Sequence, residues 1–299
     1  MKLNVDKQTL LAGIQIVQNV ISAKSALPIL SHILIEAQSD SVRLTATDLD
    51  IGISCVLPVH SVESGAITVP AKRFGDIIRE LPGNNAVINT KKNNLVTIET
   101  DTCQFKIMGL AKEEFPKLPE FKDKEAIKLD QQLLKEILLL TSFAVSFDET
   151  RYILNGILFQ INKNTLRLVA TDGKRLAITE KKIKSTSDKD IKIIVPIKTI
   201  HELNRNLRDE GELSVILGNN QVLFDLGQTV VISRLIEGEF PDYAQVIPQA
   251  TENKVIVSRE EFLLAVKRAA LLSTPDYQAV KLEVFKNKLV ISKSTPDVG

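Results

Sequence analysis

Residues 42–48 read Val-Arg-Leu-Thr-Ala-Thr-Asp, and residues 166–172 read Leu-Arg-Leu-Val-Ala-Thr-Asp, 124 positions later. Several landmarks in one order at one period indicate an internal repeat rather than a chance recurrence. The sequence therefore predicts tandem copies of one domain. The other landmarks that keep nearly this spacing are the Val-Pro pairs ending at Pro70 and Pro196 and the Phe-Pro pairs ending at Pro116 and Pro241.

A third copy of the repeat begins near Val257, where Val257-Ser258-Arg259 opens a helical pattern as Val5-Asp6-Lys7 does. Leu289–Ser292 then takes the place of the strands that precede Thr47 and Thr171. Three complete copies would need about 73 more residues than the chain has. We therefore expect domains of about 120 residues at 1–121 and 127–245, and an incomplete third domain at residues 253–299.

Each copy has the same order of predicted elements. An amphipathic helix comes first, alternating strands follow, and a second helix begins after the Val-Pro step, where the missing N–H of proline is tolerated. Two helices and several strands in each copy predict an α+β fold. The apolar helix faces consist of Leu10, Leu11, Ile14 and Val17; Phe74, Ile77, Ile78 and Leu81; Leu133, Leu134, Ile137 and Leu138; Ile200, Leu203 and Leu207; and Phe262, Leu263 and Val266.

The overall composition is that of a soluble globular protein, with 44% hydrophobic and 25% charged residues. Cys55 and Cys103 have no Cys-x-x-Cys spacing, and the N-terminus lacks an apolar signal segment, so a reduced cytoplasmic location is expected. No apolar run approaches the roughly 20 residues that span a membrane. A formal net charge of +1 argues against a protein that grips nucleic acid by bulk charge.

Positive charge is concentrated on the predicted helices. The stretches 7–20, 72–80, 131–143, 198–208 and 259–268 carry eleven Lys and Arg residues against six Asp and Glu residues. Taken alone, each helix is better explained by an ordinary solvated face. If tandem copies place equivalent helices on one side, however, the excess adds up to a basic lining that attracts phosphates without reading sequence.

These motifs resemble the bacterial DNA polymerase III β subunit family, the sliding clamps. The resemblance covers the whole chain, and it implies three domains per subunit and a head-to-tail homodimer closed into a ring around duplex DNA, with helices lining the hole and β-sheets outside. It implies a non-catalytic processivity factor without a cofactor, whose partners are a clamp loader, DNA polymerase III and other proteins with a clamp-binding motif. It rests on Leu27–Leu30, Thr45–Leu49, Val69–Lys72, Arg151–Gly156, Val169–Leu176 and Glu239–Tyr243.

The resemblance also implies DNA-contacting residues at Lys24, Lys72 and Tyr152. Two positions depart from the family pattern, because Asp148 stands where a Gln is usual and Ile153 replaces a second Tyr. An acid near phosphate repels it, so Asp148 weakens that contact. Without the resemblance, Lys24 would be read as an ordinary surface lysine.

The partner site implied by the family is an apolar hollow that accepts Leu or Phe side chains from a short peptide. Without the resemblance, Leu154 and Leu176 would be read as core residues. The implied dimer contact brings Ile77 and Phe105 of one subunit to Leu271 and Leu272 of another. The implied partner pocket consists of Leu154, Thr171, Gly173, Lys174, Arg175, Leu176, Pro241 and Val246, with Lys174 in place of a common His.

A catalytic alternative is a Mg²⁺-dependent nucleotidyltransferase that uses Asp48 and Asp172. However, Thr-Asp after a strand is more typical of a turn in which the Asp bonds its own backbone. His32, His60 and His201 show no metal-ligand spacing, and there is no phosphate-binding glycine motif. A sequence-specific DNA binder is disfavoured because no helix-turn-helix or zinc motif is present.

Overall fold

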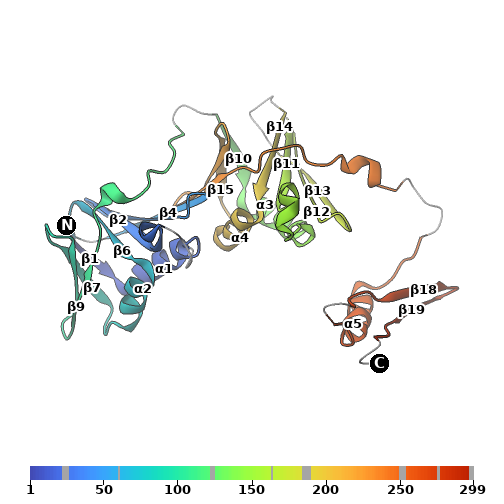
Figure 1. Cartoon of the computed structure of the whole chain (residues 1–299), viewed down its shortest axis with the longest axis horizontal. Helices are drawn as coiled ribbons and strands as arrows, with labels where there is room; N and C mark the ends of the chain where they lie inside the picture. Colours follow the sequence, from blue (N-terminus) through green and yellow to red (C-terminus); the bar gives the residue numbers. More distant parts are fainter. Residues whose placement is uncertain are drawn as a thin grey trace. The chain divides into compact units, whose positions relative to one another are not determined.

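The computed structural model describes residues 1–21, 27–59, 61–121, 125–162, 164–183, 190–248, 254–274 and 277–295. Contacts divide the chain into two compact units (Figure 1). Unit 1 covers Met1–Asp242 and holds the first two copies of the repeat, and unit 2 covers Tyr243–Gly299 and holds the third. Among the helices of the described residues, none has both the length and the hydropathy needed to cross a lipid bilayer.

The two copies in unit 1 have matching elements. The first contains β1 (Lys2–Asp6), α1 (Lys7–Gln18), β2 (His32–Gln38), β3 (Ser41–Thr47), β4 (Ile51–Pro58), β5 (Ser61–Glu63), β6 (Gly65–Pro70), α2 (Ala71–Glu80), β7 (Asn85–Thr90), β8 (Leu95–Glu99) and β9 (Gln104–Met108). The second contains β10 (Ala126–Asp130), α3 (Gln131–Leu139), β11 (Gly156–Asn162), β12 (Thr165–Thr171), β13 (Leu176–Lys182), β14 (Ile191–Pro196), α4 (Ile197–Asn206), β15 (Glu212–Leu217), β16 (Gln221–Asp225) and β17 (Thr229–Arg234).

The starts of the helices follow from capping residues that recur with the repeat. The side chains of Asp6 and Asp130 accept hydrogen bonds from the backbone N–H groups of Thr9 and Leu133, which have no partner inside the helix. Pro70 and Pro196 immediately precede α2 and α4, as the Val-Pro steps predicted. The predicted first and second helices of both copies are confirmed.

The predicted end of the third helical stretch is wrong. α3 ends at Leu139 rather than at residue 143, and Ser142–Ala144 forms a separate 3-10 turn. The Thr141 hydroxyl donates to the backbone oxygen of Ile137 at 2.8 Å. A hydroxyl that bonds the preceding turn competes with continued helix, so the chain turns here instead.

An eight-stranded sheet, in the order β10-β15-β16-β17-β4-β3-β2-β6, joins the two copies. The junction is the antiparallel pair of β17 and β4, whose register runs from Thr229 opposite Cys55 to Ser233 opposite Ile51. The first copy also has a five-stranded sheet in the order β5-β1-β7-β8-β9, and the second a four-stranded sheet in the order β13-β12-β11-β14. The copies are therefore connected by backbone hydrogen bonds as well as by side chains.

The register also places helices of both copies on one face of the long sheet. Cys55 of β4 donates from its Sγ to the backbone oxygen of Gly13 in α1, at 3.6 Å. Ser233 of β17 shares a 2.6 Å hydrogen bond with Thr199 of α4. Ser233 lies opposite Ile51, so these two side chains share a face of the sheet. Ile51 and Cys55 are four residues apart on β4, so Cys55 points to that face as well. α1 packs against α2 and α3 against α4, so both helix pairs lie on that side (Figure 1).

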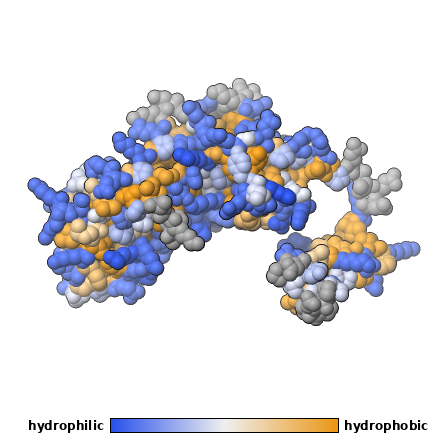
Figure 2. Space-filling view, in the orientation of Figure 1, coloured by the Kyte–Doolittle hydropathy of each residue, from blue (hydrophilic) through white to orange (hydrophobic). Residues whose placement is uncertain are grey.

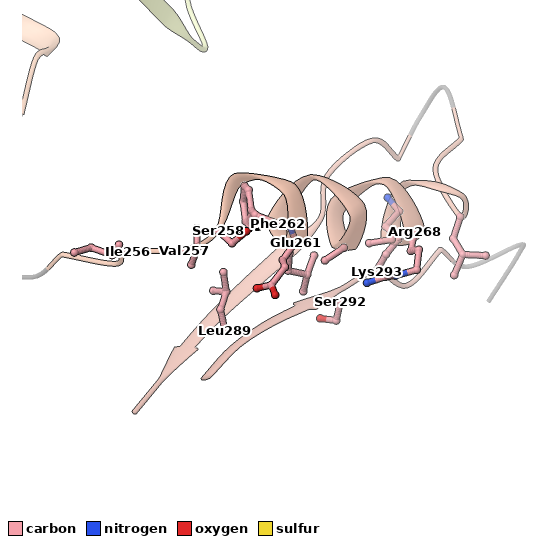
Figure 3. A pocket seen from close by; sticks show the side chains of 13 residues that line it. Ile256, Val257, Ser258, Glu261, Phe262, Arg268, Leu289, Ser292 and Lys293 are labelled. Atoms are coloured by element: carbon pink, nitrogen blue, oxygen red, sulfur yellow. Dashed lines mark hydrogen bonds between the residues drawn. The ribbon is translucent and has the colours of Figure 1, made fainter. Parts of the chain in front are cut away.

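Unit 2 contains α5 (Arg259–Ala270) and a hairpin of β18 (Lys281–Phe285) and β19 (Lys288–Ser292). Ser258 caps α5 as Asp6 and Asp130 cap α1 and α3, and the predicted third start of the repeat is confirmed. No residue of α5 is buried. A hollow of about 940 Å³ lies between α5 and β19, lined by apolar residues that include Phe262 and Leu289 (Figure 3). Apolar surface is accordingly exposed on unit 2 (Figure 2).

Candidate functional site

The two Thr-Asp segments form tight loops after β3 and β12. The Asp48 Oδ1 accepts from the backbone N–H groups of Asp50 and Ile51, and the Asp172 Oδ1 from those of Lys174 and Arg175. The N–H of Lys174 is the main cause that holds the pKa of Asp172 below its usual value. The predicted turn role of both residues is confirmed.

These loops do not assemble a metal site. In the part of the chain that the structure describes, no group of three or more His, Cys, Asp or Glu side chains is placed to hold an ion. Asp48 and Asp172 also each have a basic neighbour, since Lys198 pairs with Asp48 and Arg175 with Asp172. Their oxygens are occupied by the loop backbone and these cations.

Three segments of the second copy meet at the predicted partner surface. The Arg151 Nη1 donates to the backbone oxygen of Asp172 at 3.2 Å, and the Tyr152 hydroxyl donates to the backbone oxygen of Glu237. A Cβ atom at Gly238 would lie 3.0 Å from the Cδ1 atom of Ile153. The segment 149–154, the loop 171–176 and the segment that leads to Pro241 therefore lie together.

Gly173 is needed where the loop meets Arg151. Its φ of +84° is rarely adopted by residues with a side chain, and a Cβ there would lie 2.9 Å from the Arg151 Nη1 atom. Glycine thus lets the guanidinium reach the Asp172 carbonyl. This contact fixes the loop that carries Lys174 and Arg175.

The predicted pocket residues differ in exposure. Leu154, Thr171 and Leu176 are half-buried, whereas Gly173, Lys174, Arg175 and Pro241 are exposed. Arg175 also lies over the ring of Phe143, at 5.7 Å from its centroid. Val246 belongs to a 3-10 turn of unit 2 (Tyr243–Val246), where 68% of it is exposed.

Of the predicted DNA-contacting residues, the structure describes Lys72 and Tyr152, which both lie in unit 1. Lys72 is exposed in the first turn of α2 and has no ion-pair partner among the described residues. Tyr152 is 51% exposed. Asp148 caps the turn that follows it, and the hydroxyl of Thr150 is the main cause that lowers its pKa. Lys24 lies outside the described residues.

Several cationic side chains of the helices are engaged within the protein. Lys7 donates to the backbone oxygen of Leu81, and Lys198, the repeat counterpart of Lys72, pairs with Asp48. The basic lining is therefore weaker than the residue count alone suggested. The remaining helix pairs are Arg79 with Asp76, Lys135 with Asp209 and Arg205 with Glu202.

The predicted dimer residues lie in both units. Phe105 is 38% exposed on β9, which is an edge strand of its sheet, and Ile77 of α2 is half-buried. Leu271, at the end of α5, is 80% exposed, and Leu272 is half-buried. Met108, also on β9 and 59% exposed, was missed by the sequence analysis.

A second group missed by the sequence analysis lies at the end of α3. Leu139, Leu140, Phe143 and Phe147 are all exposed. The run Leu138-Leu139-Leu140 is the signal that could have revealed it. Consecutive residues of a helix point about 100° apart, so three leucines in a row cannot all face one core.

Comparison with known proteins covers the entire length of the chain. Residues 1–119, 128–242 and 244–299 match the N-terminal, central and C-terminal domains of the DNA polymerase III beta subunit. The beta sliding clamp of Chlamydia muridarum is 33% identical over 299 residues, which cover 100% of this chain and 82% of the relative. The beta sliding clamp of Bacillus subtilis is 33% identical over 310 residues, with the same coverage.

Solved structures agree with these sequence matches. The DNA polymerase sliding clamp from Bacillus subtilis has a TM-score of 0.95 at 32% identity, over 100% of this chain and 82% of that one. A sliding clamp from Bartonella birtlesii, bound to griselimycin, has a TM-score of 0.94 at 36% identity with the same coverage. The repeat, the capped helices and the continuous sheet thus have one explanation: this chain belongs to the family of DNA polymerase III β subunits, the sliding clamps.

Proposed function

We propose that this chain performs its role through three surfaces: a DNA-facing helix layer, a peptide-binding surface around Leu154 and Leu176, and an edge strand that joins a second copy. The role itself follows from the family. The chain is a DNA sliding clamp, a non-catalytic processivity factor that binds DNA and DNA polymerase III. The nucleotidyltransferase alternative has no support, because the oxygens of Asp48 and Asp172 serve their own loops.

The observation that carries the proposal is the sheet that runs from one copy into the next with both helix pairs on one face. A protein that slides on DNA needs a polar wall facing the duplex and a backbone framework outside it. Lys72 supplies an unpaired positive charge on the helix side, and we assign Lys24 and Tyr152 to the same wall. Contacts of this kind meet phosphates and do not select a sequence.

The repeat also indicates how copies close into a ring. The order β10-β15-β16-β17 in the second copy corresponds to β1-β7-β8-β9 in the first, so β17 and β9 are equivalent. β17 is covered by β4 of the preceding copy, whereas β9 ends its sheet. An edge strand with exposed Phe105 and Met108 is a ready template for pairing.

We therefore assign β9 and Ile77 to a head-to-tail contact with the third domain of a second subunit, at Leu271 and Leu272. Such a heterologous contact closes only if the copies turn through a complete ring. The partner face would remain free in that ring, because none of its assigned residues in unit 1 belongs to β9 or α2. These residues are Leu154, Thr171, Gly173, Lys174, Arg175, Leu176 and Pro241. We also propose that the protein is cytoplasmic. Its further partners would be a clamp loader and other proteins with a clamp-binding motif.

The test of encirclement uses topology. The protein is loaded by its clamp loader onto nicked circular DNA, the salt is raised, and the circle is then cut with a restriction enzyme. Retention on the circle followed by rapid loss after cutting is expected, because a ring slides off a free end. Equal retention on linear DNA would mean contact binding and would overturn the proposal.

The test of the peptide surface separates it from ring formation. Leu176→Ala is expected to weaken polymerase stimulation while the protein is still retained on circular DNA. Ile178→Ala, on the same strand but outside the assigned surface, is the matched control. Normal stimulation by Leu176→Ala would remove the assignment of the pocket.

A further inference from the structure

We infer that the peptide-binding surface extends onto an apolar patch at the end of α3, where it takes a second apolar side chain from a bound peptide. This end patch consists of Leu139, Leu140, Phe143 and Phe147. The inference rests on the proposed peptide surface around Leu154 and Leu176. It adds a specificity element that the family resemblance did not supply.

The exposure of the end patch is large and is imposed by the backbone. Leu139 is 60%, Leu140 50%, Phe143 56% and Phe147 72% exposed. The residues between the two phenylalanines are buried, with Ala144 at 0% and Val145 at 1%. The turn is thus anchored while both rings are held outward. Four exposed apolar side chains within the segment 139–147 indicate an interaction surface more strongly than a single exposed one does.

The end patch is continuous with the peptide surface. Arg175, an assigned pocket residue, lies over the Phe143 ring, and the backbone N–H of Ser146 donates to the backbone oxygen of Leu154 at 3.0 Å. The 3-10 turn that holds Phe143 also packs against β12, whose end leads into the loop 171–176. A chain bound along that loop therefore reaches the patch directly.

The chemistry of the patch selects a peptide rather than DNA. Duplex DNA presents phosphates, which need cations, whereas the end patch is apolar and is followed by the ionised Asp148. Arg175 and Lys174 lie where the patch meets the pocket, and Lys174 has no ion pair among the described residues. The Arg175 guanidinium contacts the Phe143 ring directly, so the pocket and the end patch adjoin.

The preferred peptide is therefore one that places Leu or Phe in the pocket and carries a further aromatic residue or Leu close by in its sequence, next to an acid. The acid would pair with Lys174 or Arg175, and the second apolar side chain would cover Phe143 and Phe147. A peptide without this extension would still enter the pocket and bind more weakly.

The experiment measures peptide affinity by fluorescence anisotropy with the complete protein. The core probe is a labelled Ser/Gly peptide with one Leu-Phe pair, and the extended probes add Glu-Phe at its amino or its carboxyl end. Matched probes add Glu-Ser instead. One Glu-Phe probe is expected to bind about tenfold more tightly than its Glu-Ser counterpart, as partial burial of one aromatic ring implies.

Substitutions in the protein test whether the gain in peptide affinity comes from the end patch. Phe143→Ser with Phe147→Ser is expected to abolish the advantage of Glu-Phe, while the core probe still binds. Val284→Ser, 60% exposed in unit 2, is the control for loss of an exposed apolar residue. Equal affinity of the Glu-Phe and Glu-Ser probes would contradict the inferred extension onto the end patch. Binding of the core probe in the same experiment would still support the proposed pocket.

Two other outcomes are also decisive. If no probe binds, the proposed peptide surface fails and the extension fails with it. If the double variant changes the sedimentation coefficient but not peptide affinity, the end patch is a contact between copies, and the peptide assignment is wrong.

Discussion

α1 and α5 occupy equivalent places in the first and third copies, yet one is buried and the other is not. Both have a capping side chain at their start and a hairpin after them. In α1, Leu10, Ile14 and Val17 are completely buried, whereas α5 has no buried residue. The difference teaches that the helix–hairpin half of the repeat has no core by itself. α1 gains its burial from α2 and from the sheet, which have no counterpart among the described residues of unit 2.

The largest expected effect of this difference is in hydrogen exchange. In the 299-residue chain, amides of α5 should exchange at least about a thousandfold faster than those of α1 and α3, because opening α5 exposes little surface that was not already in water. Exchange followed by mass spectrometry measures all three helices in one sample. Equal protection in α5 and α1 would show that unit 2 has a core that its exposure does not reveal.

Truncation of equivalent residues should give the next largest effect. Leu10→Ala and Leu134→Ala remove fully buried side chains and are each expected to destabilise unit 1 by about 2–5 kcal/mol. Phe262→Ala, at the matching position of α5, should cost less than about 1 kcal/mol because Phe262 is already partly exposed. Urea denaturation provides the free energies. A comparable cost at Phe262 would contradict the comparison.

The three caps sharpen the comparison at a smaller scale. Asp130→Ala should destabilise unit 1 by about 1 kcal/mol, and Asp6→Ala should act in the same direction, since each leaves a helix N–H without its side-chain acceptor. Ser258→Ala should not change the unfolding midpoint of unit 1. Asp6→Asn and Asp130→Asn preserve an acceptor and serve as controls. Unchanged stability in both Asp-to-Ala variants would contradict the capping role.

The smallest expected effect compares two equivalent ion pairs. Asp76 pairs with Arg79 at the surface, whereas Glu202, its repeat counterpart, pairs with Arg205 at 2.5 Å while only 3% exposed. Burial is the main cause that raises the pKa of Glu202 above 4.5. The folded chain therefore binds this proton more tightly than the unfolded chain does, and the contribution of Glu202 to stability falls as pH rises through that interval.

Glu202→Gln should accordingly become more stable relative to the wild type as pH rises from about 4.5. Thermal unfolding at several pH values measures the difference. Asp76→Asn is the matched control for loss of an acid beside an arginine. A Glu202→Gln difference that is constant with pH would show that the carboxyl titrates alike in both states.

Local features of the fold were accessible from the sequence. The starts of α1, α3 and α5 were predicted because Asp6, Asp130 and Ser258 precede apolar patterns, and the Val-Pro steps marked α2 and α4. Partnerships between distant segments were not accessible. Nothing near β4 indicates that it pairs with β17, about 180 residues away, because an alternating pattern specifies a face but not a neighbour.

The candidate site was predictable to a similar extent. The turn role of Asp172 follows from its place after a strand, but the contact of Arg151 with its carbonyl depends on tertiary packing. The unpaired positive charge of the helices was overestimated for the same reason. Lys198 and Lys135 lie on the expected helices, but their partners Asp48 and Asp209 come from other elements.

The pairing of β4 with β17 has a mechanical consequence. A pull that separates the first copy from the second along these strands loads five facing residue pairs together, so their hydrogen bonds resist it in shear. A joint held by side chains alone would yield one contact at a time. The first two copies therefore behave as one stiff arm under load along these strands.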